Sequence, residues 1–113
     1  MTAQAVIDRT DRLRPNAVSF ADKLGWLTQL DLRAFQEVIL THEHEEGITF
    51  TGHTDGESQV LIPPPYDEVY HYYLCMQMDL CGRALNMYNN DRALFASAFM
   101  TWADKVNREK MPI

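Results

Sequence analysis

Apolar side chains recur at intervals of three and four in the first 41 residues of the chain, which predicts short amphipathic helices. Pro15 should end the first of them, because proline cannot continue the helical hydrogen-bond ladder. Ser19 stands three residues before Asp22, as in a capping box, and predicts the start of the second helix. The first stripe consists of Val6, Ile7, Thr10 and Leu13, and the second begins with Phe20, Leu24 and Leu27.

An acidic residue interrupts the second apolar stripe. If the helix ran unbroken to Thr41, Asp31 would lie in the middle of its apolar face. Burying an unpaired carboxylate is costly, so we expect the helix to break there. Thr28 and Asp31 can then cap a third helix that starts near Gln29.

The helical spacing disappears in residues 42–65. Two β-prone pieces, residues 48–51 and 59–62, flank a loop, so we expect a small β-hairpin or an extended arm. This arm has few large apolar residues of its own, which predicts that it is mobile in isolation or pinned by a neighbouring subunit. In the second case Phe50 and Ile62 are the expected contact residues.

A long antiparallel helical hairpin is predicted for residues 66–108. An apolar run from Tyr66 to Tyr88 fits one helix, and Asn89-Asn90 tolerates turn geometry before a second helix. The second helix carries Phe95, Phe99, Trp102 and Val106 at spacings of four, three and four.

The apolar arc of the helix predicted from Tyr66 to Tyr88 is unusually wide. At about 100° per residue, its apolar side chains span roughly 200°, against the roughly 100° or more of a helix that buries one face. We therefore expect other copies of the chain, or a partner, to cover what the small fold cannot. The expected contact residues on this helix are Tyr66, Tyr70, Tyr72, Tyr73, Met76 and Met87.

These elements predict a mainly all-α fold with four to five helices, a long C-terminal helical hairpin and a small β-hairpin or extended arm in the middle. The length of 113 residues predicts a single domain, residues 1–113. Within it, residues 1–41 hold the N-terminal helices, residues 42–65 the arm and residues 66–108 the hairpin.

Charge and composition disfavour several classes of function. The net charge is −6 and the ten Lys and Arg residues are not clustered, so the chain repels phosphates and duplex binding is disfavoured as its main role. No apolar run approaches the roughly 18 residues of a membrane span. The N-terminus lacks the basic start and apolar segment of a signal peptide, which predicts a cytoplasmic location. Cys75 and Cys81 are separated by about 9 Å along one helix, too far for a disulfide, and should be reduced.

Histidine and carboxylate residues raise the question of a metal site. His42 and His44 point to different sides of a helix, whereas the zinc-binding pattern His-Glu-x-x-His needs a wider spacing. Glu68 and His71 form one Glu-x-x-His motif, but a di-iron bundle needs two. The chain contains no Gly-x-Ser-x-Gly turn and no glycine-rich phosphate loop. We therefore expect no catalytic residue, no cofactor, no metal and no enzymatic activity. A metal-dependent enzyme that uses these residues is the least favoured alternative.

Seven short segments follow one another in a recognisable order. They are Leu13-Arg14-Pro15-Asn16, Trp26-Leu27-Thr28-Gln29-Leu30-Asp31, Phe35-Gln36-Glu37-Val38, Thr41-His42-Glu43, Pro64-Pro65-Tyr66-Asp67-Glu68-Val69-Tyr70, Tyr88-Asn89-Asn90-Asp91 and Phe95 to Trp102. Together they resemble small proteins encoded in prophages near the capsid genes. Those proteins are similar to the head-tail connector (adaptor) family of long-tailed bacteriophages.

The resemblance implies a mostly helical virion structural protein that forms a ring below the portal and extends the channel for DNA. The implied partners are further copies of the chain, the portal protein and a tail or stopper protein, with DNA only as passing cargo and no membrane. An acidic chain suits this channel, because carboxylates do not grip a moving duplex. The implied location is the virion, and the host cytoplasm during assembly. The alternative is a small helical adaptor module that binds a partner as a dimer through the same Tyr- and Met-rich surface.

Overall fold

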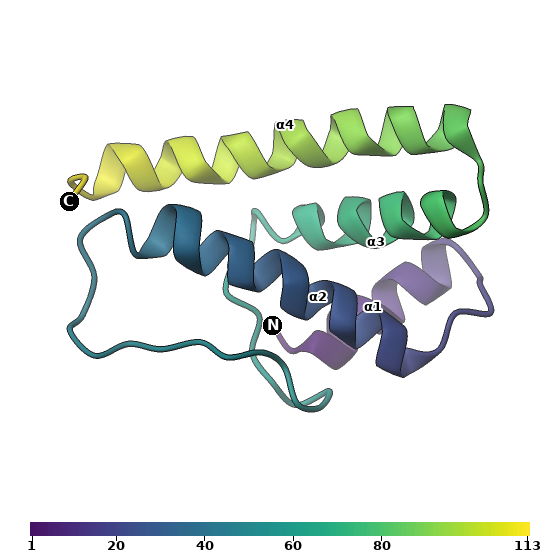
Figure 1. Ribbon diagram of the computed structural model, residues 1–113, viewed down its shortest axis with the longest axis horizontal. Helices are drawn as coiled ribbons and strands as arrows, with labels where there is room; N and C mark the ends of the chain where they lie inside the picture. Colours follow the sequence, from purple (N-terminus) through teal and green to yellow (C-terminus); the bar gives the residue numbers. More distant parts are fainter.

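The computed structural model describes residues 1–113 and confirms that the chain is mainly helical (Figure 1). The helices are α1 (Ala3–Leu13), α2 (Phe20–Ala34), α3 (Glu68–Cys81) and α4 (Leu85–Glu109), and α2 runs directly into a π-helical turn, η1 (Phe35–Ile39). The side-chain oxygens of Thr2 and Ser19 each accept a hydrogen bond from the backbone N–H three residues later, which caps α1 and α2. The helix start predicted from Ser19 is therefore confirmed.

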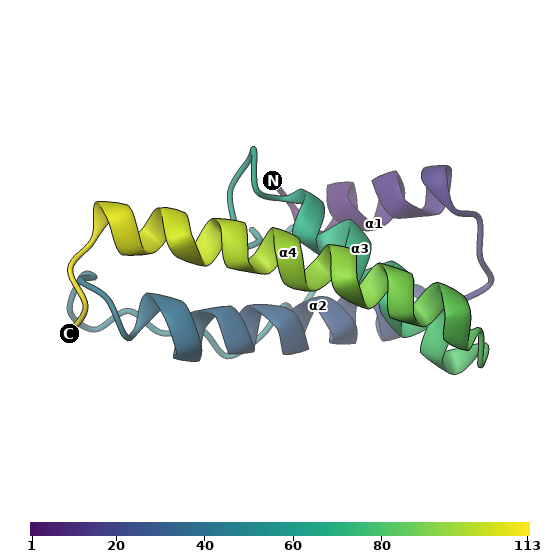
Figure 2. The same cartoon turned by 90° about the horizontal axis from the view of Figure 1, so that it is seen from above.

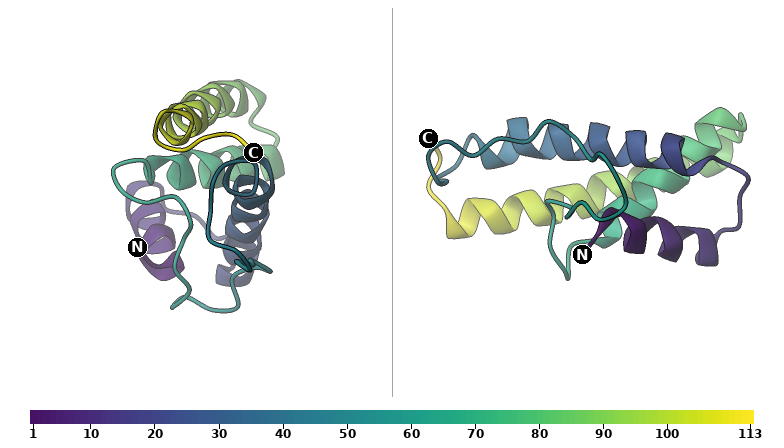
Figure 3. Two further views of the ribbon diagram at one scale, coloured as in Figure 1. Left: turned by 90° about the vertical axis from the view of Figure 1, so that its left-hand side faces the viewer. Right: turned by 90° about the horizontal axis from the view of Figure 1, so that it is seen from below.

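Helix α3 lies at the centre of the fold. α4 covers one side of it, and α1 and α2 cover the other side (Figures 1 and 3). Seen from above, α4 runs between α1 and α2 (Figure 2). None of the helices is both long enough and apolar enough to cross a membrane. The core lies where the helices meet, and includes Val6, Ile7, Leu27, Leu30, Tyr70, Leu74, Phe95, Phe99 and Trp102.

Most of the wide apolar arc of α3 is covered by the protein's own helices, whereas its C-terminal end stays exposed at Leu80 and Cys81. Val69, Tyr70 and Leu74 are completely buried, and Tyr73 is 9% exposed. The expectation that this fold cannot cover the whole apolar arc is therefore wrong for the middle of α3, but it holds for Leu80 and for Met87, which are 51% and 52% exposed. A helix packed between two layers buries two faces, so the arc of a surface helix is the wrong comparison.

α3 and α4 run antiparallel and pack against each other (Figure 1). The break between them lies at residues 82–84, and the break predicted at Asn89-Asn90 is wrong. Arg83 takes a left-handed backbone conformation, with a φ of 56°, where the chain turns. Met87 fits the apolar arc of the preceding helix by sequence, but it lies in the first turn of α4 instead.

Helix α2 passes through Asp31 without a break, so the separate third helix predicted near Gln29 does not form. The helix widens further along, at η1, where the N–H of Leu40 donates to the carbonyl of Phe35 five residues earlier (2.9 Å). Asp31 is completely buried, and hydrogen bonds from α3 and from the arm satisfy its carboxylate.

The segment that follows η1 is an irregular arm, and the predicted β-hairpin within it does not form. The β-type pairings are two isolated bridges, Thr2 with Gln59 and His42 with Pro112. The second half of the arm is tied to the N-terminus of the same chain, because Ala3 N–H donates to Ser58 O (2.8 Å) and Val60 N–H donates to Met1 O (3.0 Å). The arm runs across α1 and α2 on the side away from α4 (Figure 3).

Candidate functional site

A buried hydrogen-bond network centred on Asp31 joins α2, α3 and the arm. Tyr70 donates its hydroxyl proton to Asp31 Oδ1 (2.6 Å), and His53 Nε2 lies 2.6 Å from Asp31 Oδ2. The backbone N–H of Leu61 donates to Oδ2 (3.2 Å), and the N–H of Ile62 donates to the Tyr70 hydroxyl (2.7 Å). Burial and the charge of Asp31 raise the pKa of Tyr70, so its hydroxyl stays protonated. These bonds offset the cost of burying the carboxylate.

The Asp31 network is closed to solvent, because the side chains of Asp31 and His53 are 0% and 1% exposed. The ring of Phe50 packs edge-on against His53, with centroids 5.1 Å apart. No substrate can reach the polar atoms of this network. Because two of its hydrogen bonds come from the arm, the network holds the arm in place. Sequence reasoning missed this role. The available signal was an acid in an apolar stripe of a chain that also offers a histidine and a tyrosine.

A second group of charged side chains joins α1, α3 and α4. Arg14 Nη2 lies 2.5 Å from Asp79 Oδ1, and Arg14 Nη1 lies 3.5 Å from Asp91 Oδ2. Asp79 is completely buried, and its Oδ2 has no hydrogen-bond partner among the atoms of the chain. Burial and the nearby carboxylate of Asp79 raise the pKa of Asp91 to about 6. Arg14 therefore links α1 to the end of α3 and to the start of α4 through these two carboxylates.

His71 and Cys75 lie beside this cluster and face α1. His71 Nδ1 is 3.1 Å from Thr10 Oγ1, and His71 Nε2 is 3.7 Å from Cys75 Sγ. Burial raises the pKa of the Cys75 thiol and lowers the pKa of His71. Both groups are thus held uncharged, whereas a cysteine nucleophile needs a thiolate. Glu68, the other member of the Glu-x-x-His motif, is exposed and lies 3.9 Å from Arg9.

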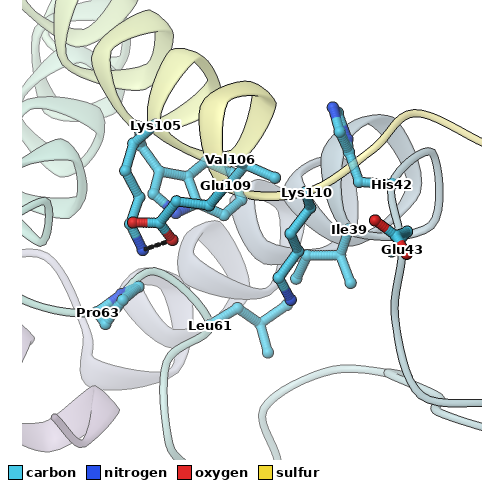
Figure 4. Close-up of a pocket in the computed structure, with 10 residues that line it drawn as sticks. Ile39, His42, Glu43, Leu61, Pro63, Lys105, Val106, Glu109 and Lys110 are labelled. Atoms are coloured by element: carbon cyan, nitrogen blue, oxygen red, sulfur yellow. Dashed lines mark ion pairs between the residues drawn. The ribbon is translucent and has the colours of Figure 1, made fainter.

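A small pocket opens between the end of α4, the end of α2 and the arm (Figure 4). Its volume is about 210 Å³, below the roughly 300–1,000 Å³ that is usual for ligand sites. Lys105 and Glu109 on its wall pair with each other at 3.1 Å (Figure 4). The charges in this pocket are therefore already partly satisfied within the chain.

The histidines considered as metal ligands are occupied by other contacts. His42 lines the pocket with Nδ1 2.7 Å from the Val38 carbonyl oxygen and Nε2 bonded to the side chain of Asn107. His44 Nδ1 lies 2.7 Å from the carbonyl oxygen of His42. No group of three or more His, Cys, Asp or Glu side chains is placed to hold a metal ion.

An open apolar groove lies on the surface where α2, α3 and α4 meet, with a volume of about 400 Å³. We call this surface the α4 groove. α4 lines it with Tyr88, Arg92, Phe95, Ala96, Phe99 and Met100. The other helices contribute Tyr73 and Met76 from α3 and Arg33 from α2. The guanidinium of Arg33 lies over the ring of Phe99, 4.9 Å from its centroid, so a cation and apolar surface are presented together.

The structure distributes the eight predicted interface residues between core and surface. Tyr70 and Ile62 are completely buried in the core, and their assignment to a contact surface is corrected because no partner can reach them. Met76 and the largely buried Tyr73 line the α4 groove. Met87 is 52% exposed, whereas Tyr66, Tyr72 and Phe50 are half-buried.

No family model, no curated protein and no solved structure matches this chain. The functional argument therefore depends on the geometry of these surfaces and on the sequence resemblance. The buried Asp31 network and the Arg14 cluster are internal. The α4 groove is the accessible surface where large apolar side chains gather next to charge.

Proposed function

We propose that this protein is a structural subunit of a phage or prophage virion, a head-tail connector that forms a ring below the portal. The observation that carries the proposal is the apolar surface that remains exposed on α4 after the chain has folded. Met87 and Met100 are 52% and 58% exposed, and Met100 borders a groove of about 400 Å³. Exposed apolar surface of this kind marks an interaction site.

The organisation of the fold supports an assembly role. The Asp31 network and the bonds from the arm to the N-terminus hold the chain in one defined shape. A subunit of a closed ring needs such a fixed shape, because small errors in the angle between neighbours accumulate around the ring. The order of the seven sequence segments that resemble connector proteins supports the same function.

The net charge supports passage of DNA rather than its capture. The chain carries a net charge of −6, and acidic surfaces repel the phosphate backbone. In this proposal DNA is cargo in the ring channel, while the binding partners are neighbouring subunits, the portal protein and a tail or stopper protein. The subunit belongs to the virion and, during assembly, to the host cytoplasm.

The test is the protein content of particles released by the strain that encodes the chain. Purified virions should contain the chain in about the same copy number as the portal protein, measured by quantitative mass spectrometry with isotope-labelled peptides. Particles that contain capsid and portal proteins but lack the chain would rule out a connector.

A dimeric adaptor is the second candidate, and the α4 groove is the observation that favours it. The groove spans three helices and is mostly apolar, which is the surface that an amphipathic helix of a partner uses. An adaptor would be found outside particles and would form a dimer of fixed size. Measurement of the particle content and of the native mass therefore separates the two candidates.

A further inference from the structure

Two different exposed surfaces lie on opposite flanks of α4. Met87 and Leu94 are seven residues apart and therefore share one flank; their side chains are 52% and 40% exposed. We call this pair the α4 ridge. The rim of the α4 groove, with Ala96 and Met100, lies about 120–180° further around the helix. The buried rings of Phe95 and Phe99 separate the ridge from the rim.

The two surfaces differ in charge as well as in shape. The groove carries two arginines, Arg33 and Arg92, and both are exposed. Carboxylates outnumber cations on the ridge flank, because Arg14 pairs with both Asp79 and Asp91, and Arg9 lies near both Asp67 and Glu68. Glu68 borders the same flank further along the helix, next to Ala98 and Thr101. An exposed apolar pair beside an excess of carboxylates therefore lies on the opposite flank of α4 from an apolar groove with two arginines.

We infer that the α4 ridge of one copy occupies the α4 groove of the next, and that this contact builds the ring. The inference rests on the proposed connector function and specifies its subunit interface. Met87 and Leu94 would fill the groove between Met76 and Met100, while Arg92, which has no ion-pair partner within its own chain, faces the carboxylates of the ridge flank. The joined surfaces are different and lie on opposite flanks, so each added copy leaves a free ridge and a free groove. Such a head-to-tail contact closes into a ring when the rotation per subunit allows it.

The full chain is tested as Leu94→Asp, Met100→Asp and a control, Ser97→Asp, at an exposed position on the outer side of α4. Native mass spectrometry is performed on each protein alone and with the portal protein of the same genome. Circular dichroism establishes that each variant keeps the helical content of the wild type. The wild type and Ser97→Asp should form closed rings, whereas neither Leu94→Asp nor Met100→Asp should form any species larger than a monomer.

Mixing the two disrupted variants gives the sharpest result. Met100→Asp keeps an intact ridge and Leu94→Asp keeps an intact groove, so one functional contact can form between them. An equimolar mixture should therefore give heterodimers and no larger species. Dimers of Leu94→Asp by itself would instead show a symmetric groove-to-groove contact and overturn the inference.

The outcomes also separate this inference from the proposed function. If the wild type forms rings and both aspartate variants form the same rings, the ring remains and the assigned surfaces are wrong. If the wild type forms no ring even with portal protein, the inference falls together with the ring. If virions contain the chain at portal copy number while both variants enter virions normally, the connector function stands and the interface does not.

Discussion

Removal of a single hydroxyl group tests whether the Asp31 network holds the arm on the helices. In Tyr70→Phe, the ring keeps its place in the core, but Asp31 Oδ1 loses a donor at 2.6 Å and the N–H of Ile62 loses an acceptor at 2.7 Å. Both groups remain buried, since Tyr70 and Ile62 are 0% exposed and Asp31 is 0% exposed. Water cannot replace the lost partner unless the arm moves.

The cost follows from the groups that are left unpaired. A buried N–H without an acceptor costs about 1–3 kcal/mol, and loss of a bond to a charged group costs about 1.5–3 kcal/mol. Partial relaxation of the arm reduces the sum, so we expect a loss of about 3 kcal/mol in the free energy of unfolding. For a chain of this length the midpoint of thermal unfolding should fall by about 12 °C.

Urea unfolding followed by circular dichroism measures the free energy, and hydrogen exchange measures the local effect. The amides of Leu61 and Ile62 should exchange faster in Tyr70→Phe than in the wild type. The matched control is Tyr72→Phe, which removes a hydroxyl from a half-buried tyrosine of the same helix outside the network. A difference of less than about 0.5 kcal/mol between Tyr70→Phe and the wild type would refute the role assigned to the network.

Three further tests examine other parts of the structure. Asp91→Asn should raise the free energy of unfolding at pH 7.5 by about 1 kcal/mol, a value reduced by solvent screening of the partly exposed side chain. The raised pKa of Asp91, about 6, means that the folded state binds this proton more tightly than the unfolded state. The wild type therefore loses stability as pH rises through about 6. The advantage of the variant should disappear toward pH 4, where the carboxyl group is protonated in the folded protein. Gly25→Ala, in open space within α2, should stabilise the protein by roughly 0.5–1 kcal/mol. Gly52→Ala should destabilise it by about 1 kcal/mol or more, because Gly52 has a φ of 137° and an added Cβ would lie 3.0 Å from a methyl group. Equal effects of the two substitutions in urea unfolding would contradict the local backbone description. Exposed Cys81 should react with a thiol reagent in the native protein, and Cys75, which is buried and has a raised pKa, should react only on unfolding; equal rates would show that α3 is open.

The sequence was sufficient for features that depend on neighbouring residues. The first helix ends just before Pro15, which has no N–H to continue it. Ser19 caps the second helix through a hydrogen bond within one turn, so both features could be predicted from neighbouring residues. The periodic aromatic residues of the last helix likewise placed Phe95 and Trp102 in the core. In these cases, local sequence and final packing agree.

The sequence was insufficient where distant residues change the energy of a local choice. Asp31 seemed too costly to bury in α2, but His53 and Tyr70 lie 22 and 39 residues away and satisfy it. The middle of the wide arc of α3 looked uncovered for the same reason, since helices from both ends of the chain cover it. The break before α4 was misplaced for a different reason. The apolar residues on both sides of residues 82–84 were assigned to one helix, although Gly82, which caps the end of α3, was an available local signal.

The candidate interface was predictable only in part. Met76 and Met87 could be chosen as contact residues because they are large and apolar, and both lie at the surface or at its edge. Leu94 and Met100 were not singled out, although they are 40% and 58% exposed. Leu94 and Met100 lie on opposite flanks of α4, which becomes apparent only when the packing of α4 on α3 shows which side of α4 is buried.

Cross-linking between the two flanks of α4 tests the head-to-tail assembly most directly. The assembled chain carries Leu94→Cys and Met100→Cys in a Cys81→Ser background, and is treated with a short bismaleimide before denaturing electrophoresis. A ladder of products up to the size of the ring is expected from the double variant, while either single variant should remain monomeric because like positions do not meet. Dimers from Leu94→Cys alone, or an assembled double variant without cross-links, would contradict the account.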